Sequence, residues 1–422
     1  MTRFGRNSMV APNVWASRYD ACIAALPEAA AAAPLTFCGL GACIDARVSM
    51  HDMQALLDAS DPHAAAFAAL LLGRAEAGVG GEVAVDWPEG PGWLATHVPM
   101  VTSLGGTGPH AAWVLSTLGA PALLCLGDRS SFMLEHVPPG ILLAEGGRIG
   151  LAAEVAPRGV RRPAIFIFEY TAGRAVGPLI PRRSSRIIVR FHNLGLEDDP
   201  DFDALTPSLA PQAGAGLLSG YSAVPADDLD RELARTMALG RRWRAAGLQT
   251  IHLELAGYDS LDLVERVLAS SRGVATSVGM SHSELIAIDG RDGDPAAAMR
   301  RLGERTGFDR VCVHADHWAA AVTKRDPDVE MQALMTGCLL ASARAEAGKP
   351  VLPSALGPSA RFHDLPMPEH ARHGEWQAVA CASPYLERPL TTLGLGDTFT
   401  AGCLLALGQE RAAEEKRDRA TA

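Results

Sequence analysis

The strongest constraint on the fold is a regular alternation of short apolar segments and longer amphipathic segments beyond about residue 205. Residues 250–256, 274–280 and 309–316 are apolar runs of strand length, and neighbouring stretches such as 225–247 and 329–347 have the pattern of helices. Strand, helix and strand in succession build a parallel sheet with helices on both faces. We therefore predict an α/β fold around a mainly parallel central sheet.

The first apolar segment, residues 35–45, predicts one buried strand that ends on Asp45. Ligands of open α/β sheets bind at the carboxyl ends of the strands, so Asp45 is a candidate for holding substrate hydroxyls. The alternative is a turn aspartate that closes the strand. Further along, Gly105 and Gly106 precede a predicted helix. They would let a sugar approach the backbone closely, or would serve only as the helix cap.

Two strands are predicted at 164–169 and 186–191, joined by a basic loop that includes Pro-Arg-Arg-Ser-Ser-Arg at 181–186. Guanidinium groups there could neutralise a phosphate, although such a run is more often a solvated loop. Between 46 and 102 the pattern is weaker and contains a segment rich in glycine and proline at 78–92. This part of the chain is consistent with an inserted lid.

Near the C-terminus, residues 392–402 combine a glycine turn with the start of a buried helix. Gly394 and Gly396 flank Leu395, and Asp397 follows at once. The free N–H groups of such a turn lie at the positive end of the helix dipole and favour a phosphate. A carboxylate there can accept the proton of a hydroxyl while the N–H groups hold a phosphoryl group, as a small-molecule kinase requires. The alternative is that Asp397 only caps the helix.

Two acids stand at neighbouring predicted strand ends. Glu254 shares a strand face with His252, and Glu284 follows the next strand. A charge inside a buried strand is costly unless it is paired or bound to a metal. Because both acids would face the same crevice as 394–397, we expect them to hold Mg²⁺ through water. A buried ion pair or a capping role is the alternative for each. Histidines also occur at 314–317, where local hydrogen bonds are a commoner role than metal binding.

The composition excludes several classes of partner. A net charge of −10 over 422 residues argues against binding to nucleic acid. The eight cysteines show no C-x-x-C spacing and are expected to be buried thiols in a reducing compartment. The sequence has neither the apolar core of a signal peptide nor an apolar run of transmembrane length. We therefore expect a cytoplasmic protein with no membrane partner.

Taken together, several segments resemble the ADP-dependent sugar kinases, the glucokinase and phosphofructokinase group of the ribokinase-like superfamily. Residues 391–398 are similar to that group's T-V-G-L-G-D-T signature, and 251–256 are similar to its H-x-E motif. Residues 277–285 resemble its S-x-G-M-N-E-x-E-L segment. Five further segments resemble motifs of the same group: Ile44-Asp45 resembles N-x-N-I-D, Gly105-Gly106 resembles G-G-Q, 166–169 resemble I-F-E-F, 181–188 resemble A-P-R-x-N-R-F-I, and 218–221 resemble L-S-G-Y.

The resemblance implies a ribokinase-like three-layer sandwich with a mainly parallel central sheet and a smaller, discontinuous α/β lid. It implies a catalytic domain at 36–45, 103–158 and 205–408, and a lid domain at 46–102 and 159–204. Residues 409–422 are rich in charged side chains, and we expect them to form a charged tail.

The implied activity is the Mg²⁺-dependent transfer of the terminal phosphate of ADP, giving AMP, to a hydroxyl of a sugar or sugar derivative. In this resemblance Asp397 is the catalytic base. Gly394, Leu395 and Gly396 form the anion hole for the nucleotide phosphate, and Arg186 reaches the phosphate in transfer. The group's members are often monomers, so we expect a monomer or a small homo-oligomer.

The same resemblance assigns the remaining site residues. Asp45, Gly105 and Gly106 fall on positions that bind the sugar. Glu254 and Glu284 fall on the acids that organise the metal ion and its water.

Five positions depart from the family pattern. Ser281 and His282 replace an asparagine and an acid, Gly41 and Cys43 replace asparagines before the substrate aspartate, and Thr107 replaces a glutamine. Two alternatives therefore stay open at this level. One is an ATP-dependent kinase for a nucleoside or polyol, and the other is a catalytically weakened sensor of sugars or nucleotides.

Overall fold

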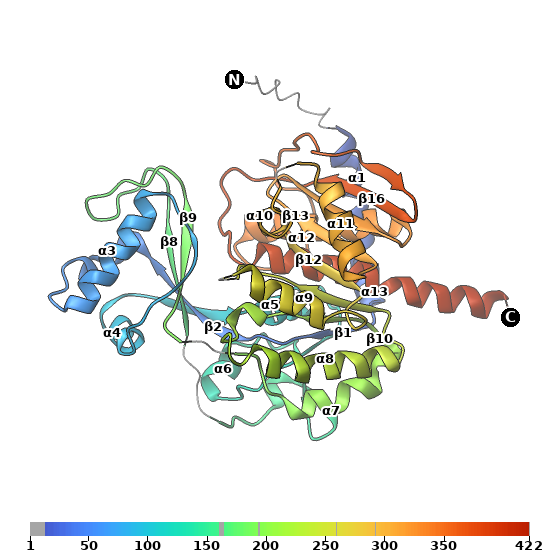
Figure 1. Ribbon diagram of the computed structural model, residues 1–422, viewed down its shortest axis with the longest axis horizontal. Helices are drawn as coiled ribbons and strands as arrows, with labels where there is room; N and C mark the ends of the chain where they lie inside the picture. Colours follow the sequence, from blue (N-terminus) through green and yellow to red (C-terminus); the bar gives the residue numbers. More distant parts are fainter. Residues whose placement is uncertain (1–12, 160–163, 193–194, 259, 292, 422) are drawn as a thin grey trace.

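The computed structural model describes residues 13–159, 164–192, 195–258, 260–291 and 293–421. These residues form two sheets. An 11-stranded sheet lies at the centre of the larger body, and a 5-stranded sheet forms the smaller body at the left of Figure 1. We refer to the smaller body as the lid.

The large sheet is mainly parallel, as predicted. Strands β1, β5, β6 and β10–β13 pair in parallel, whereas β7, β14, β15 and β16 pair antiparallel at the two sides. In spatial order the strands are β15 (His370–His373), β16 (Trp376–Ala382), β14 (Trp318–Thr323), β13 (Arg310–His314), β12 (Ser277–Ser281), β11 (Thr250–Glu254), β10 (Ala213–Leu218), β1 (Leu35–Cys38), β5 (Ala122–Leu124), β6 (Leu142–Glu145) and β7 (Arg148–Leu151).

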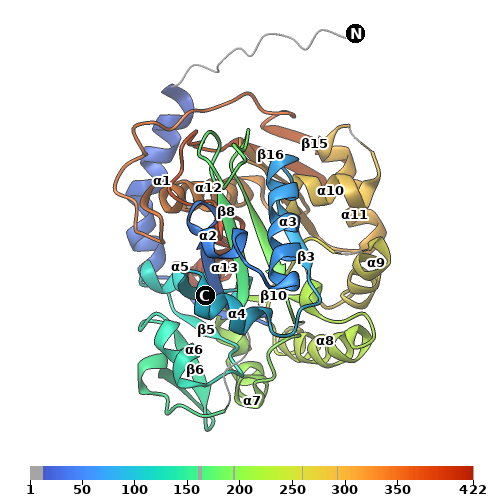
Figure 2. The same cartoon turned by 90° about the vertical axis from the view of Figure 1, so that its left-hand side faces the viewer.

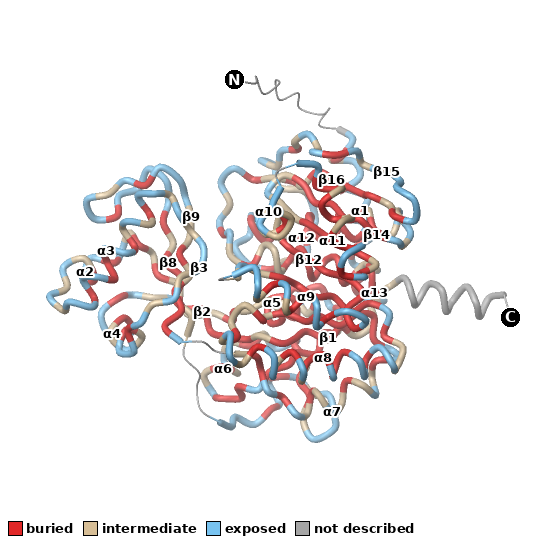
Figure 3. The backbone as a smooth tube through the Cα atoms, viewed as in Figure 1, coloured by how far each residue is buried: buried red, intermediate tan, exposed pale blue. Residues whose placement is uncertain are grey.

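Helices cover both faces of this sheet and complete a three-layer sandwich. One face packs against α1 (Asn13–Ala31), α5 (Thr107–Thr117), α12 (Pro327–Ala347) and α13 (Leu395–Thr421). The other face packs against α7 (Pro200–Leu209), α8 (Leu229–Ala245), α9 (Leu261–Ser270), α10 (His282–Asp289) and α11 (Pro295–Thr306). A short helix, α6 (Ser131–His136), lies beside strand β4 (Val101–Gly105) of the lid. Figure 3 shows the sheet and the inner faces of these helices as the buried part of the molecule.

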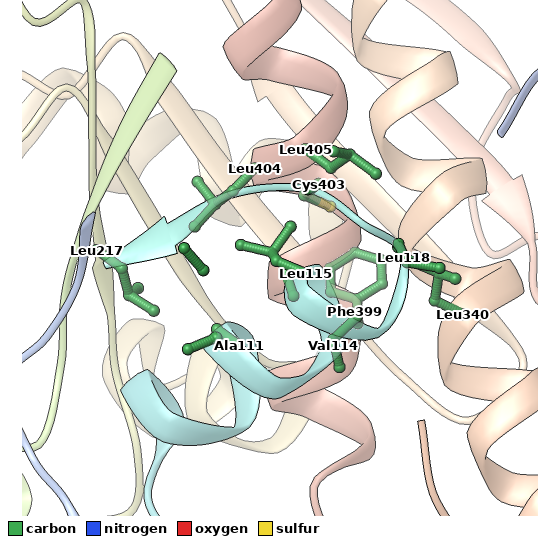
Figure 4. Close-up of a cluster of buried hydrophobic side chains, with 14 of the residues drawn as sticks. Ala111, Val114, Leu115, Leu118, Leu217, Leu340, Phe399, Cys403, Leu404 and Leu405 are labelled. Atoms are coloured by element: carbon green, nitrogen blue, oxygen red, sulfur yellow. The ribbon is translucent and has the colours of Figure 1, made fainter. Parts of the chain in front are cut away.

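The packing of α5, α12 and α13 places the C-terminal helix. Val114 and Leu115 of α5, Leu340 of α12 and Phe399 of α13 belong to one buried cluster (Figure 4). Glycine allows the close approach of α12 and α13, because a Cβ atom on Gly402 would lie 2.7 Å from the Cα atom of Gly337. This contact brings the start of α13 beside the last turns of α12.

The lid sheet has the order β3 (Gly81–Ala84), β9 (Ser185–Arg190), β8 (Ile165–Tyr170), β2 (Cys43–Ser49) and β4 (Val101–Gly105). Its outer face is covered by α2 (Gln54–Leu57), α3 (Pro62–Glu76) and α4 (Gly90–His97), which lie in front of the lid strands in Figure 2. Strands β8 and β9 are the pair predicted at 164–169 and 186–191. Since Ala46 and Val48 point into the lid core, Asp45 and Arg47 point toward the large sheet.

The prediction of a single strand over 35–45 is wrong. The segment divides into β1, in the large sheet, and β2, in the lid sheet. The break falls at Gly39–Gly41, where a Cβ atom on Gly41 would lie 3.1 Å from the Cα atom of Gly220. Glycine inside an apolar run marks such a close backbone approach. Asp45 is therefore carried by the lid.

At the other end of the chain, α13 continues through residues 409–421, where a separate charged tail was expected. Among the described helices, none is both long enough and apolar enough to cross a membrane.

Candidate active site

The predicted site residues meet at the carboxyl edge of the large sheet, where β11, β12 and β13 end and α13 begins. Glu254 ends β11, Glu284 lies in the first turn of α10 after β12, and Asp397 lies in the first turn of α13. The lid strands β2 and β9 contribute Asp45 and Arg186 from the opposite side. These residues come together because the strands are parallel, so the carboxyl ends of β11, β12 and β13 lie at the same edge of the sheet.

The glycine turn before α13 has the expected form. Gly394 has a φ angle of +68°, a conformation that favours glycine, and a Cβ atom there would lie 2.5 Å from the guanidinium of Arg344. Thr398 closes the first helical turn, since its N–H and its hydroxyl both donate to the carbonyl of Gly394, at 3.0 and 2.7 Å. The pKa of Asp397 is raised by burial, which outweighs the lowering by a hydrogen bond from Thr107 and by the charge of Arg344.

Asp45 is buried between β2 and β4. A side chain on Gly105 would collide with its carboxylate, so the glycine predicted to admit a sugar also makes room for the acid. The Sγ atom of Cys43 donates to Oδ1 of Asp45 at 3.5 Å, and Nε2 of His110 lies 3.9 Å from Oδ2. Burial, helped by the charge of Asp397, raises the pKa of Asp45 to about 7. This carboxyl group therefore changes charge near neutral pH.

Glu254 stands in a different environment, because its oxygens already have partners. Nε2 of His252 lies 2.8 Å from Oε2, and the hydroxyl of Thr400 donates to the same atom at 3.1 Å. His314 lies 3.8 Å from Oε1. Burial alone would raise the pKa of Glu254, but the hydrogen bonds and charges of His252 and His314 outweigh it and lower the pKa to about 2. Glu254 is therefore ionised, and the pKa of His314 is raised in turn.

Glu284 both caps a helix and faces the site. The N–H of Ser281 donates to Oε2 of Glu284 at 2.7 Å, and the N–H of Glu284 donates to the hydroxyl of Ser281 at 3.3 Å. This reciprocal pair is a capping box. Burial and the nearby charge of Glu254 raise the pKa of Glu284, and burial is the larger cause. Ser281, which departs from the family pattern, is thus the N-cap of α10.

Arg186 reaches from the lid to the glycine turn. Its Nη1 atom donates to the hydroxyl of Thr392 at 3.2 Å, and its Nε atom is buried without a hydrogen-bond partner. Arg182 and Arg183, in the same predicted basic loop, are exposed. The loop therefore divides into one arginine at the site and two that face solvent.

Three site residues were not assigned to this site from the sequence: His110, His314 and Arg344. His314 was noted only as part of a histidine cluster. Arg344 lies on the stripe of α12 that also carries Gly337 and Leu340, all three buried. A charged residue on a buried helical stripe is unusual, and this signal could have identified Arg344.

A separate cavity lies at the opposite, amino edge of the sheet. It has a volume of about 540 Å³ and includes Thr250, Asp309, Lys324 and Arg325 in its lining. Lys324 pairs with Glu375 at 3.1 Å, and Arg325 donates to the hydroxyl of Thr250 at 3.0 Å. This cavity contains none of the predicted site residues.

Comparison with known proteins assigns the family. A family model described as the ADP-specific Phosphofructokinase/Glucokinase conserved region matches residues 35–406. The chain belongs to this family. The match includes every predicted site residue, from Asp45 to Asp397. The prediction of an ADP-dependent sugar kinase is therefore confirmed.

Relatives of this family member are distant in sequence. An ADP-specific phosphofructokinase of Thermococcus zilligii is 24% identical over 366 residues, covering 74% of this chain and 78% of that protein. A solved ADP-dependent kinase in complex with fructose-6-phosphate and ADPbetaS has a TM-score of 0.77 at 17% identity, over 94% of this chain and 99% of that one. The adenosine kinase of Sinorhizobium meliloti has a TM-score of 0.50 at 15% identity, over 89% and 87%. These structures confirm the ribokinase-like fold.

Proposed function

We propose that this ADP-dependent sugar kinase transfers phosphate at the site between the lid and the start of α13, with Asp397 as the base. The acceptor oxygen loses its proton to the Asp397 carboxylate and forms a bond to the terminal phosphorus of ADP. The bond from that phosphorus to the bridging oxygen breaks, and AMP leaves with the bridging oxygen. The observation that carries this proposal is the position of Asp397 beside the free N–H groups of a helix start, where its charge interacts with that of Asp45.

The phosphate in transfer carries negative charge that needs fixed donors. The N–H groups at 394–396 supply such donors at the positive end of α13. Arg186 adds a guanidinium from the lid, and its unpartnered Nε leaves a donor for a phosphate oxygen. Because Arg186 comes from the lid and bonds to Thr392 of the turn, lid closure and phosphate contact are coupled.

The acids at the sheet edge fit a magnesium ion held through water. Mg²⁺ keeps several water ligands and is bound through one or two carboxylates and the substrate phosphates. In the described part of the chain, no group of three or more His, Cys, Asp or Glu side chains forms a metal cage. Oε2 of Glu284 accepts from Ser281, which leaves Oε1 for a metal-bound water. The paired oxygens of Glu254 suit an orienting role toward such water. When bound, the ion neutralises charge on the nucleotide phosphates.

The acceptor is proposed to be a sugar or sugar phosphate held by Asp45. Fructose 6-phosphate is the first compound to test, because a structural neighbour holds it and the relative from Thermococcus zilligii is a phosphofructokinase. In this chain Arg47 stands two residues beyond Asp45 on the same face of β2, where it pairs with Glu169 at 3.2 Å. A cation at this position suits an acceptor that carries a phosphate.

The test is a panel of acceptors with ADP and Mg²⁺, read as AMP formed. We expect AMP with ADP and a sugar acceptor, and little turnover when ATP replaces ADP. A panel that includes fructose 6-phosphate and glucose separates a phosphorylated acceptor from a free sugar. Turnover with ATP alone would reject the proposed donor. Binding of sugar and ADP without any AMP would instead support the sensor alternative.

A further inference from the structure

Arg344 is a buried cation without a carboxylate partner. It lies in the last turns of α12 and is 3% exposed. Its Nη1 atom donates to the hydroxyl of Thr398 at 2.9 Å, and Nη2 donates to Nδ1 of His110 at 3.2 Å. Its Nε atom has no partner, and among the described residues no carboxylate oxygen lies within 4 Å of the guanidinium. Burying a charge without a counter-ion costs several kcal/mol, so its position needs an explanation beyond packing.

The guanidinium of Arg344 packs directly against the glycine turn at Gly394. A Cβ atom on Gly394 would lie 2.5 to 2.7 Å from its atoms, so the turn can form there only with glycine. Through this position Arg344 acts electrostatically on both Asp397 and Asp45, and its charge lowers the pKa of each. A single cation therefore acts on both the proposed base and the acceptor-binding acid.

The hydrogen bond to His110 fixes the protonation of that ring. Arginine only donates, so Nδ1 of His110 must accept, and the ring proton lies on Nε2. Burial and the charge of Arg344 lower the pKa of His110 well below its usual value, so the ring is neutral. The Nε2–H group is buried without a hydrogen-bond partner, 3.9 Å from Oδ2 of Asp45. His110 thus places an unpartnered donor near the acceptor-binding acid.

We propose that Arg344 is a positioning residue that couples the two halves of the reaction. It keeps Asp397 ionised for proton removal, and through His110 it orients Asp45 toward the acceptor hydroxyl. This inference rests on the roles proposed above for Asp397 and Asp45. It adds a reason for the unpaired charge: a fully paired arginine would not be free to act on both acids.

Other charged groups act on the same two acids. Asp397 is influenced by Glu254 and His314 as well as by Arg344, and it receives a hydrogen bond from Thr107. Asp45 is influenced by Cys43, Arg47 and Asp397 as well as by Arg344. Of these groups, Arg344 is the one whose charge lowers the pKa of both acids. Its removal is therefore the substitution that should affect the two acids together.

The test is Arg344→Met, studied by steady-state kinetics as a function of pH. Without the cation the pKa of Asp397 rises, so the acid limb of kcat/KM should move to higher pH, by about one unit. The KM for the acceptor should rise roughly tenfold because His110 loses its fixed orientation. The melting temperature should not fall, because the substitution removes an unpaired buried charge. An unchanged acid limb together with an unchanged acceptor KM would overturn the proposal.

Two further variants keep the test decisive. Arg344→Lys retains the charge and should move the acid limb less than Arg344→Met; an equal movement would contradict the electrostatic role. His110→Phe should raise the acceptor KM and leave the acid limb in place; an unchanged KM would remove His110 from the proposal. Nitrogen-15 NMR of the His110 ring should show the proton on Nε2 in the wild type and a mixture of tautomers in Arg344→Met. A single tautomer in both proteins would exclude the coupling through His110.

A control is the double substitution Arg305→Met and Glu265→Leu, which removes an arginine together with its partner at an ion pair of 2.6 Å between α11 and α9. It should leave the acid limb and the acceptor KM unchanged, and a shift there equal to that of Arg344→Met would contradict a specific role for Arg344. Failure of this inference is distinct from failure of the proposed function. If Asp397→Asn is inactive but Arg344→Met keeps the wild-type pH profile, only the inference on Arg344 fails. If Asp397→Asn is fully active, the proposed base itself is wrong.

Discussion

The two ends of helix α12 each carry a buried charged residue, but among the described residues one has an ion-pair partner and the other does not. At its first turn Glu330 is fully buried and pairs with Arg310 through three nitrogen-to-oxygen contacts of 2.7 to 2.9 Å. Fourteen residues later, about 21 Å along the helix, Arg344 is also buried, but its partners are the hydroxyl of Thr398, the neutral ring of His110 and the face of Trp113, 5.6 Å from its guanidinium carbon. The first end lies at the amino edge of the sheet and the second at the carboxyl edge.

This difference separates a structural charge from a functional one. The Arg310–Glu330 pair satisfies itself within the protein and leaves nothing for a ligand. Around Arg344 several polar groups of the described chain lack partners. Asp45 and Asp397 both have raised pKa values, and Nε2 of His110 and Nε of Arg186 have no hydrogen-bond partner among the described residues. Proteins retain such costly arrangements at sites where a ligand completes them. We therefore propose that the groups around Arg344 serve ligand binding, whereas the Arg310–Glu330 pair serves stability.

The largest effect is expected at the paired end. Arg310→Met leaves the Glu330 carboxylate buried without its partner, which should lower the free energy of unfolding by about 3–5 kcal/mol. Denaturant unfolding measures this loss. The corresponding change at the other end, Arg344→Met, should not lower stability. Equal losses for the two arginines would remove the distinction between the two ends.

A somewhat smaller effect is expected from Arg186→Met. The loss of one charged donor to the phosphate in transfer should lower kcat by about 10²-fold. Arg182→Met, in the exposed part of the same loop, is the matched control and should retain wild-type turnover. If both variants lose activity to the same extent, the loop acts through its overall charge and not through Arg186.

The two acids Asp45 and Glu254 should respond to pH in opposite directions. The pKa of Asp45 is raised to about 7 in the folded protein, whereas it is about 3.9 in the unfolded chain. Between these two pH values the folded state therefore binds more protons than the unfolded state. The contribution of Asp45 to stability falls as pH rises from about 4 to 7. Asp45→Asn removes this cost. The variant should be more stable than the wild type at pH 8, by at least about 1 kcal/mol, and should gain nothing at pH 4.

Glu254→Gln provides the opposite case. The pKa of Glu254 is lowered to about 2, so its contribution to stability is present above the unfolded pKa of about 4.3 and is lost as pH falls through 2. This variant should be less stable than the wild type at pH 7, and the difference should shrink toward pH 2. Thermal unfolding of both variants across pH measures the two slopes. Slopes of the same sign would show that the two acids do not differ as described.

The smallest effect is expected at Ser281. Ser281→Ala removes the N-cap of α10 and should cost about 1 kcal/mol of stability. Ser281→Asn restores both the cap and the usual family residue, and it should change stability and kcat little. A large gain in kcat for Ser281→Asn would show that the serine weakens catalysis, as the sensor alternative supposes.

The sequence predicted the parts of the site that follow from a strand and its end. Glu254, Glu284 and Asp397 could be placed at one edge because parallel strands bring their carboxyl ends together. The break between β1 and β2 could not be predicted in the same way, because an apolar run looks the same whether it forms one buried strand or two. Strand β2 lies in the lid and not in the large sheet because the chain turns at Gly41, which packs against Gly220, a residue far away in the sequence.

The role of Arg344 depends even more on tertiary contacts. The residue reaches the glycine turn because Gly337 and Gly402 let α12 and α13 touch, and these two glycines are distant in the chain. The hydrogen-bonding partner His110 comes from α5. No local sequence pattern could show that α5, α12 and α13 meet at this point. Ser281 differs from Arg344 in this respect. It departs from the family pattern, but a serine before a helix is an ordinary N-cap, and the structure shows it in that role.

The most direct test of the account is the turnover of Asp397→Asn with ADP, Mg²⁺ and the sugar acceptor, beside a measurement of ADP binding by thermal shift. Loss of the proton acceptor should lower kcat by about 10²–10⁴-fold, while ADP still raises the melting temperature. Turnover within a few-fold of the wild type would contradict the assignment of Asp397 as the base and, with it, the description of the carboxyl edge as the reacting site.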